Sequence, residues 1–288
     1  MIELDSIYDL FDPAVGGQGA LMPYMVKAFI HCQILEFLSH SPHASKLSFI
    51  GGTNLRLVSH IDRFSEHLDF DCNGMSGSEF LSMTDSIEQY LSRCGYRVES
   101  ERRERKLVAG SVRSLYFPHL CFSRGLDRGY REAVFTVNIT RQEPACAYDT
   151  QPVFIKSMGY FFPFPAPPME ILTAMKLSAL LSRAKGRDFY DALFLMQRSE
   201  PSYAFLEEAH GIGTKEQLKA SLLALVDRTD LKRKRQDFEH LLFDKRQSGN
   251  ILFFGQFIEE WGGRRSSVKK SHQGVLSVSF PSGCLLTT

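Results

Sequence analysis

The sequence predicts an α+β protein, in which a small mixed β-sheet flanked by helices is followed by an all-helical domain. Two observations lead to this prediction. Up to about residue 160, short apolar segments that end at Gly-Gly or Asn-Gly alternate with segments of helical periodicity. After a Pro- and Phe-rich stretch at 144–168, only helical periodicity remains. We therefore expect a first domain at 1–160, a helical domain at 166–262 and a mobile tail at 263–288.

The composition of the 288 residues is typical of a globular protein and gives no sign of a membrane segment. The hydrophobic fraction is 43% and the net charge is +1, which excludes a global basic field for nucleic acid. No apolar run is long enough to span a membrane, and the acidic N-terminus lacks a signal pattern. The 6 cysteines form no CxxC pair. We therefore expect reduced thiols and a cytoplasmic location.

Apolar periodicity places the elements of the first domain. Predicted helices cover 21–38, 53–59 and 80–94, and predicted strands cover 47–50, 68–72, 96–100, 111–121 and 133–140. Thr53 is available to cap the second of these helices. We expect the charged run 101–106 to form an exposed hairpin loop, and Gly125–Gly129 to form a turn.

Proline and glycine punctuate the second domain. The proline density at 144–168 excludes a helix there, and we interpret this stretch as the linker between the domains. Pro168 fits the first position of the helix that follows, and Gly186 interrupts the helical pattern. Helices are predicted at 168–183, 188–198, 200–209, 214–227 and 230–243, with a last apolar segment at 251–261.

The stretch FIGGTNLRLVSHIDRFSEHLDFD, residues 49–71, contains the main candidates for chemistry. Gly51 and Gly52 end a short strand before a helix, and glycines let backbone N–H groups approach phosphate oxygens. Asp69 and Asp71 share one face of the next strand because side chains alternate along it. Two adjacent carboxylates repel each other unless a cation or proton lies between them, and Mg²⁺ meets that need. The alternative for the two glycines is a tight turn without a ligand, and the alternative for the two aspartates is a charged, solvent-exposed strand face.

The segment before the aspartate strand adds two polar candidates. Arg63 and Ser65 precede the strand closely enough to contact phosphates. The alternative for Arg63 is a salt bridge to Asp62, to Glu66 or to an aspartate of the pair.

At this point the residues resemble a known family. GGTNLRL…RFSEHLDFD, followed by MKLSALLSRAKGRDFYDALFL, is similar to the two motifs of the AbiEii/AbiGii-type nucleotidyltransferase toxins. The second motif comprises Lys176, Arg183, Arg187, Asp188 and Asp191, and the resemblance covers roughly residues 20 to 200. It implies the minimal nucleotidyltransferase fold and a place among the toxins of bacterial toxin–antitoxin and phage-abortive systems.

The resemblance also implies roles for individual residues. Gly51, Gly52 and Thr53 would bind nucleotide phosphates, and Asp69 and Asp71 would hold magnesium. Lys176 would contact the triphosphate, and Asp188 would complete the catalytic site from the second domain. Helix spacing places Arg183 on the same helix face as Lys176, where both could present positive charge to bound nucleotide across the cleft. The alternatives are a solvated Lys176, a helix-capping Asp188, and an Asp191 that pairs with Arg187.

Three positions depart from the family pattern. Ile50 replaces a lysine that often precedes the glycines, and His67 replaces an acid. Asn138 lies where a third carboxylate is expected on a later strand, and an amide does not accept a proton at neutral pH.

The expected function is metal-dependent transfer of a nucleoside monophosphate from an NTP to an acceptor, with Mg²⁺ or Mn²⁺ as the cation. By resemblance, the favoured acceptor is RNA such as the tRNA 3′ end, in a type IV-like toxin–antitoxin or phage-defence system with a cognate antitoxin protein. The basic stretches 101–106 and 232–235 are candidate RNA contacts, with a solvated surface as the alternative. Two other functions remain open: a nucleotide-binding relative without turnover, and a protein-interaction module.

Overall fold

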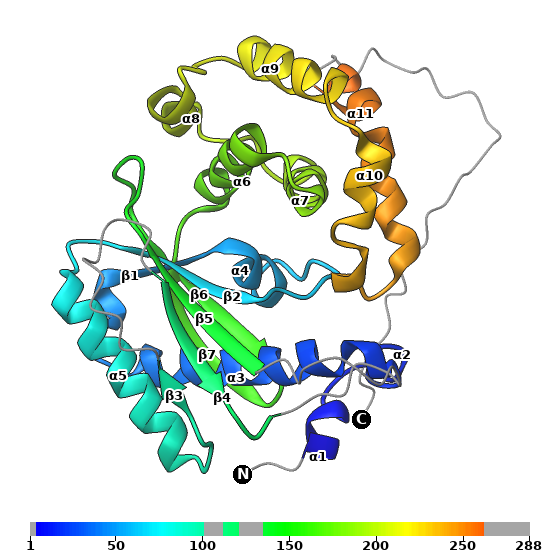
Figure 1. The fold of residues 1–288 in the computed structure, drawn as a ribbon. Coiled ribbons are helices and arrows are strands. Elements are labelled where there is room, and N and C mark those ends of the chain that lie inside the picture. Colours follow the sequence, from blue (N-terminus) through cyan, green and yellow to red (C-terminus); the bar gives the residue numbers. More distant parts are fainter. Residues whose placement is uncertain (1–3, 101–111, 121–134, 262–288) are drawn as a thin grey trace, which may run out of the picture.

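The computed structural model describes residues 4–100, 112–120 and 135–261. The chain forms a sheet with helices, then a helical half that we define as residues 169–261 (Figure 1). The exposed loop predicted at 101–106, the Gly125–Gly129 turn and the tail at 263–288 lie outside the described residues. Among the helices that the structure describes, none combines the length and apolarity that crossing a bilayer requires.

A five-stranded mixed sheet organises the first part of the chain, which confirms the predicted fold class. Its spatial order is β1 (Leu47–Ile50), β2 (His67–Cys72), β5 (Phe135–Gln142), β4 (Val112–Phe117) and β3 (Glu99–Ser100). β2 and β5 are parallel, whereas the other neighbouring strands are antiparallel. The register places Asp69 between Ile50 of β1 and Thr140 of β5.

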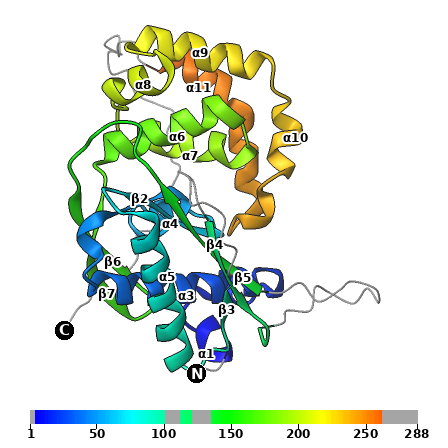
Figure 2. The same ribbon diagram turned by 60° about the vertical axis from the view of Figure 1, so that its left-hand side comes forward.

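The sheet has one apolar face and one polar face, because apolar and polar side chains alternate along its strands. Leu68, Phe70, Leu115, Val137 and Ile139 are buried on what we call the core face. Two helices cover that face, α3 (Met22–Ser39) and α5 (Gly77–Arg93), as Figure 2 shows. α5 begins with a capping box in which Ser76 and Glu79 satisfy each other's backbone N–H groups. The opposite, polar face carries the candidate aspartates.

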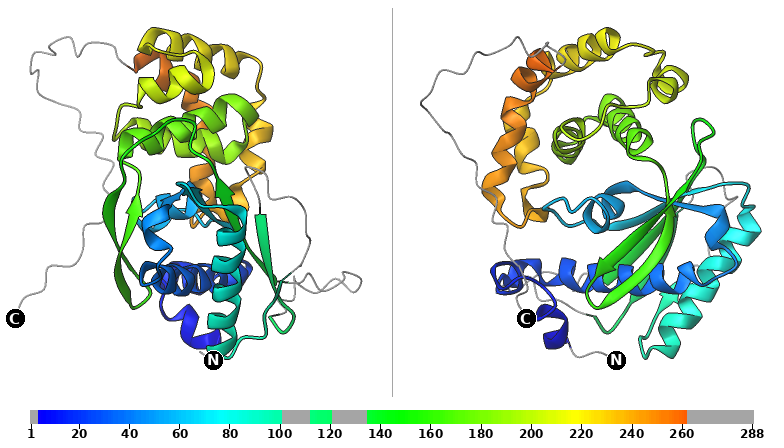
Figure 3. Two further views of the ribbon diagram at one scale, coloured as in Figure 1. Left: turned by 90° about the vertical axis from the view of Figure 1, so that its left-hand side faces the viewer. Right: turned by 180° about the vertical axis from the view of Figure 1, so that it is seen from behind.

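The Pro-rich stretch is a β-hairpin, so our interpretation of 144–168 as a linker was wrong. β6 (Gln151–Ser157) pairs antiparallel with β7 (Tyr160–Ala166), and Ile155, Phe162 and Phe164 are buried in the same core as the sheet. A two-stranded sheet consists only of edge strands, where a missing N–H donor is tolerated. Figure 3 shows the hairpin beside the larger sheet.

The helical half has its own apolar core. Its α-helices are α6 (Met169–Arg183), α7 (Gly186–Met196), α8 (Tyr203–His210), α9 (Lys215–Asp227), α10 (Leu231–Gln236) and α11 (Phe254–Glu260). Figure 1 places them on the side of β2 and α4 (Gly51–Leu57) away from α3. The segment predicted as one helix at 230–243 ends its α-helix at Gln236, and 3₁₀ turns follow at Glu239–Leu241 and Lys245–Phe253.

Short 3₁₀ and helical pieces complete the N-terminal region: α1 (Leu4–Tyr8), α2 (Pro13–Gly16) and the 3₁₀ turns Gly19–Leu21 and Ala44–Lys46. α4 starts at Gly51 rather than Thr53, so Thr53 lies inside the helix and does not cap it.

Candidate active site

The turn between β1 and α4 is built around Gly51. Its φ is +80°, a left-handed conformation that suits glycine. A Cβ atom at this position would overlap the Asp69 carboxylate, which lies directly against the glycine. No side chain caps the start of α4. The absence of a side chain at Gly51 therefore lets a candidate metal ligand and a backbone turn come into contact.

Gly52 brings the other side of the turn against the loop that leads into β2. A Cβ atom at Gly52 would lie 2.8 Å from Ser65 Oγ and 2.9 Å from Arg63 Nη2. Thr53 is buried, and its hydroxyl donates to the carbonyl of His67 at 2.5 Å. The structure thus places Gly51, Gly52, Thr53, Arg63 and Ser65 around one turn, as their proposed shared role requires.

Asp69 and Asp71 lie on the same face of β2, as predicted, but in different surroundings. Asp71 is only 3% exposed, and Asp69 is partly exposed. Burial raises the pKa of Asp71, and the charge of Asp69 raises it further, whereas a hydrogen bond from Tyr148 lowers it. A cation beside the pair would favour its ionised form. Their oxygen atoms are the hard ligands that Mg²⁺ prefers, usually together with substrate phosphates and water.

These two carboxylates do not belong to a larger metal centre in the described part of the chain. No cluster of three or more His, Cys, Asp or Glu side chains suited to a metal occurs there. On β5, Thr140 lies opposite Asp69 and Gln142 opposite Asp71. Asn138 lies opposite His67, and its Oδ1 accepts a hydrogen bond from Ser114 at 2.8 Å. The neighbouring strand therefore supplies no third carboxylate at these positions.

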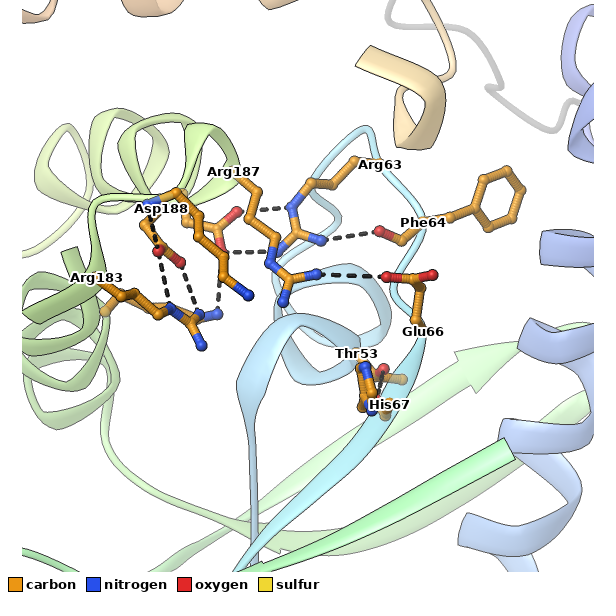
Figure 4. A network of polar contacts seen from close by, with 11 residues as sticks. Thr53, Arg63, Phe64, Glu66, His67, Arg183, Arg187 and Asp188 are labelled. Carbon is orange, nitrogen blue, oxygen red and sulfur yellow. Dashed lines mark hydrogen bonds and ion pairs between the residues drawn. The ribbon is translucent and has the colours of Figure 1, made fainter. Parts of the chain in front are cut away.

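Arg63 forms a fully buried ion pair that links the turn to the helical half. Its Nε and Nη2 atoms each donate to Asp191 at 2.7 Å, and its Nη1 donates to the carbonyl of Phe64 at 2.8 Å. Asp191 is on α7 and 128 residues later in the chain. None of the three ion-pair partners proposed for Arg63 from the sequence is the observed one. Arg187, which was proposed as the partner of Asp191, instead faces Glu66 at 3.5 Å (Figure 4).

Asp191 also holds Lys176. The Nζ atom of Lys176 on α6 lies 3.0 Å from Asp191 Oδ2, and both residues are buried. Burial alone would raise the pKa of Asp191, but Arg63 and Lys176 outweigh it and lower that pKa to about 2. Asp191 is therefore an anion between two cations. Lys176 is buried in this network, so the alternative of a solvated lysine does not hold.

Asp188 is engaged in a separate pair at the start of α7. Arg183 donates to its two carboxylate oxygens at 2.9 and 2.8 Å, and the Lys185 backbone N–H donates at 3.1 Å. Figure 4 shows Arg183 and Asp188 facing each other. Asp188 is fully buried, whereas the Arg183 side chain is 44% exposed. Lys185 is the N-cap of α7 and Asp188 its third residue, so the expectation that Asp188 is the N-cap was wrong, although its carboxylate does accept from the N-cap backbone N–H. Of Arg183 and Asp188, only Arg183 is open to solvent.

Two contacts at the candidate site were missed from the sequence. The pairing of Asp191 with Arg63 joins the two motifs directly, although both residues had been singled out separately. Tyr148 lies in an irregular segment after β5, and its hydroxyl donates to Asp71 Oδ2 at 2.5 Å. A tyrosine two residues after Cys146, in a short segment without helical or strand periodicity, gave no signal in the sequence.

The fold and the two joined motifs define the chain as a nucleotidyltransferase. The model of a family described as nucleotidyl transferase AbiEii toxin, type IV TA system, matches residues 33–251, and the chain belongs to that family. A search of curated proteins gave no match.

Solved structures include similar folds at low sequence identity. MenT4, a nucleotidyltransferase toxin from Mycobacterium tuberculosis, aligns with a TM-score of 0.52 and 14% identity over 90% of this chain and 99% of its own. JHP933 from Helicobacter pylori has a TM-score of 0.46 and 18% identity over 82% of this chain and 92% of its own. MenT4 shares the fold across almost the whole chain, in agreement with the predicted nucleotidyltransferase-like architecture.

Proposed function

We propose that this chain transfers a nucleoside monophosphate from an NTP to an acceptor hydroxyl, with Mg²⁺ or Mn²⁺ as its cation. The observation that supports this most directly is the contact of the Gly51–Gly52 turn with Asp69 on one side and with Arg63 and Ser65 on the other. Backbone N–H groups able to meet phosphate oxygens therefore lie next to carboxylates suited to a cation.

Each side chain has a role in this proposal. Asp69 and Asp71 hold the cation, which when bound neutralises triphosphate charge and assists attack at the α-phosphorus. Lys176 contacts the triphosphate from a position fixed by Asp191, and the half-exposed Arg183 adds positive charge. The guanidinium of Arg63 is occupied by Asp191 and Phe64, so it supports the turn from within the protein.

For the acceptor we propose RNA, such as the 3′ end of a tRNA, and for the partner a cognate antitoxin protein. The family description as a toxin of a type IV system supports both, since modified RNA would stop growth. Lys232 and Arg233 are exposed on α10 and available to phosphates. A cytoplasmic location and a role in phage defence complete this proposal.

The test incubates the full chain with each labelled NTP, Mg²⁺ or Mn²⁺, and either total RNA or protein. We expect label on RNA with wild type and none with Asp69→Ala/Asp71→Ala. Asp62→Ala is the matched control, because Asp62 is an exposed aspartate of the loop that leads into β2. Wild type that transfers no label from any NTP, or a double variant as active as wild type, would contradict the proposal.

One observation favours a second candidate, a nucleotide-binding relative without turnover. Asn138 occupies the position expected for a third carboxylate and is hydrogen-bonded to Ser114 rather than to an acid. In this case nucleotide with Mg²⁺ would stabilise the fold by about 2.7 kcal/mol at ~100 times its dissociation constant, without label transfer. Thermal unfolding measures this, and the absence of a shift with every nucleotide would rule it out.

A further inference from the structure

The segment between β5 and β6 lies against the polar face of the sheet at Tyr148. Its side chains alternate: Cys146 and Tyr148 are half-buried, whereas Ala145, Ala147 and Asp149 are exposed. The two half-buried residues pack against the hydrophobic cluster formed by the core of the helical half together with Leu55 and Ile61. An irregular segment without helix or ladder bonds is therefore anchored by two inward-facing side chains.

The hydroxyl of Tyr148 donates to Asp71 Oδ2 at 2.5 Å, and Asp71 is almost fully buried. A phenol is protonated at neutral pH, so Tyr148 is a hydrogen-bond donor. One oxygen of Asp71 is held by the protein, which fixes the rotation of the carboxylate about its Cβ–Cγ bond.

The two aspartates are supported by different structures. Asp69 lies against the backbone of Gly51, so the turn itself limits its position. Asp71 is held by a side chain instead, because Tyr148 donates a hydrogen bond to it. Tyr148 also packs against the hydrophobic cluster that includes the core of the helical half, and this packing holds its ring in place.

We propose that Tyr148 is a positioning residue that orients Asp71 as a ligand of the divalent cation. This inference rests on the proposed function, because it needs Asp69 and Asp71 to bind the cation. Groups that hydrogen-bond to a metal ligand fix its orientation, and their removal typically lowers metal affinity by about 10–100-fold. Tyr148 does not contact the cation or the nucleotide in this proposal.

The experiment measures Mn²⁺ binding to the full-length protein by electron paramagnetic resonance, with no nucleotide present. We expect Tyr148→Phe to weaken Mn²⁺ binding by about 10–100-fold. Tyr96→Phe is the matched control, since it removes a buried phenol that donates to Gln33 at 2.9 Å. It should bind Mn²⁺ like wild type. Each variant loses only one oxygen atom, so we expect both to fold. Urea unfolding of both variants checks this.

The outcomes separate this inference from the proposed function. Asp69→Asn/Asp71→Asn should lose the Mn²⁺ that wild type binds. If wild type and this double variant bind Mn²⁺ equally, the metal site is absent and both proposals are overturned. If the double variant loses Mn²⁺ but Tyr148→Phe binds it as tightly as wild type, only the role of Tyr148 is overturned.

Discussion

At the scale of single residues, Arg63 determines how the two motifs meet. It is 1% exposed and bonded to Asp191 and to the Phe64 carbonyl. Burial alone would lower the pKa of Arg63, but Asp191 outweighs this and raises it, so the guanidinium stays charged. A buried pair of this kind contributes little over an apolar pair of the same volume, but it is costly to break on one side.

We therefore predict that Arg63→Met lowers the free energy of unfolding by about 3–5 kcal/mol, since it removes one of the two cations beside a buried carboxylate. Arg63→Met/Asp191→Leu should lose less than the sum of the two single variants. The measurement is urea unfolding.

The control for this prediction is Arg246→Met, which breaks the pair with Asp244 at the surface. It should change stability by less than about 1 kcal/mol, because exposed ion pairs contribute little. Strict additivity of the Arg63 and Asp191 variants would contradict the coupling.

At the scale of elements, the β1–turn–α4 unit depends on one backbone conformation. Gly51→Ala would place a methyl group on the Asp69 carboxylate as well as strain a left-handed backbone. Gly74 has a φ of +63°, and a Cβ atom added there would have no other atom within 4 Å. The two substitutions thus share the conformational cost, and only Gly51→Ala adds the steric one.

We predict that Gly74→Ala costs about 1–2 kcal/mol of stability and leaves label transfer intact. Gly51→Ala should cost more than this and should abolish transfer, because it displaces Asp69. Unfolding in urea and the labelled-NTP assay measure the two effects. Equal stability losses for the two variants would show that the Asp69 contact adds nothing.

Sequence patterns predicted the elements well where a period was visible. Alternation placed Asp69 and Asp71 on one face, and apolar spacing located α3, α5 and α6 to within a few residues. The hairpin at 151–166 was missed because prolines argue against a sheet, and nothing in the sequence showed that both strands are edges. The partner of Arg63 was missed because carboxylates nearby in sequence and one 128 residues away are equivalent until the chain is folded.

At the scale of the whole molecule, the two halves are joined by more than one ion pair. The Phe64 N–H donates to the Leu241 carbonyl at 2.8 Å, and Arg63 forms an isolated β-bridge with Leu242. Glu66 and Arg187 add a pair at 3.5 Å. The loop before β2 is therefore packed into the end of the helical half.

This packing predicts that the halves unfold together. The chain has 1 tryptophan, Trp261, which packs against the core of the helical half. Its fluorescence should follow the same urea transition as far-UV circular dichroism, which reports on all elements. A fluorescence midpoint clearly different from the circular dichroism midpoint would show that the helical half unfolds separately.

The ion pair between Arg63 and Asp191 also has a consequence for synthesis on the ribosome. The Gly-Gly turn and both aspartates of β2 are translated first, whereas Lys176 and Asp191 follow more than a hundred residues after Gly51. Until α6 and α7 have left the exit tunnel, a nascent chain has the turn and the carboxylates without Lys176 and Asp191. A frameshift or stop codon before α6 would thus release a chain without the basic half of the candidate site.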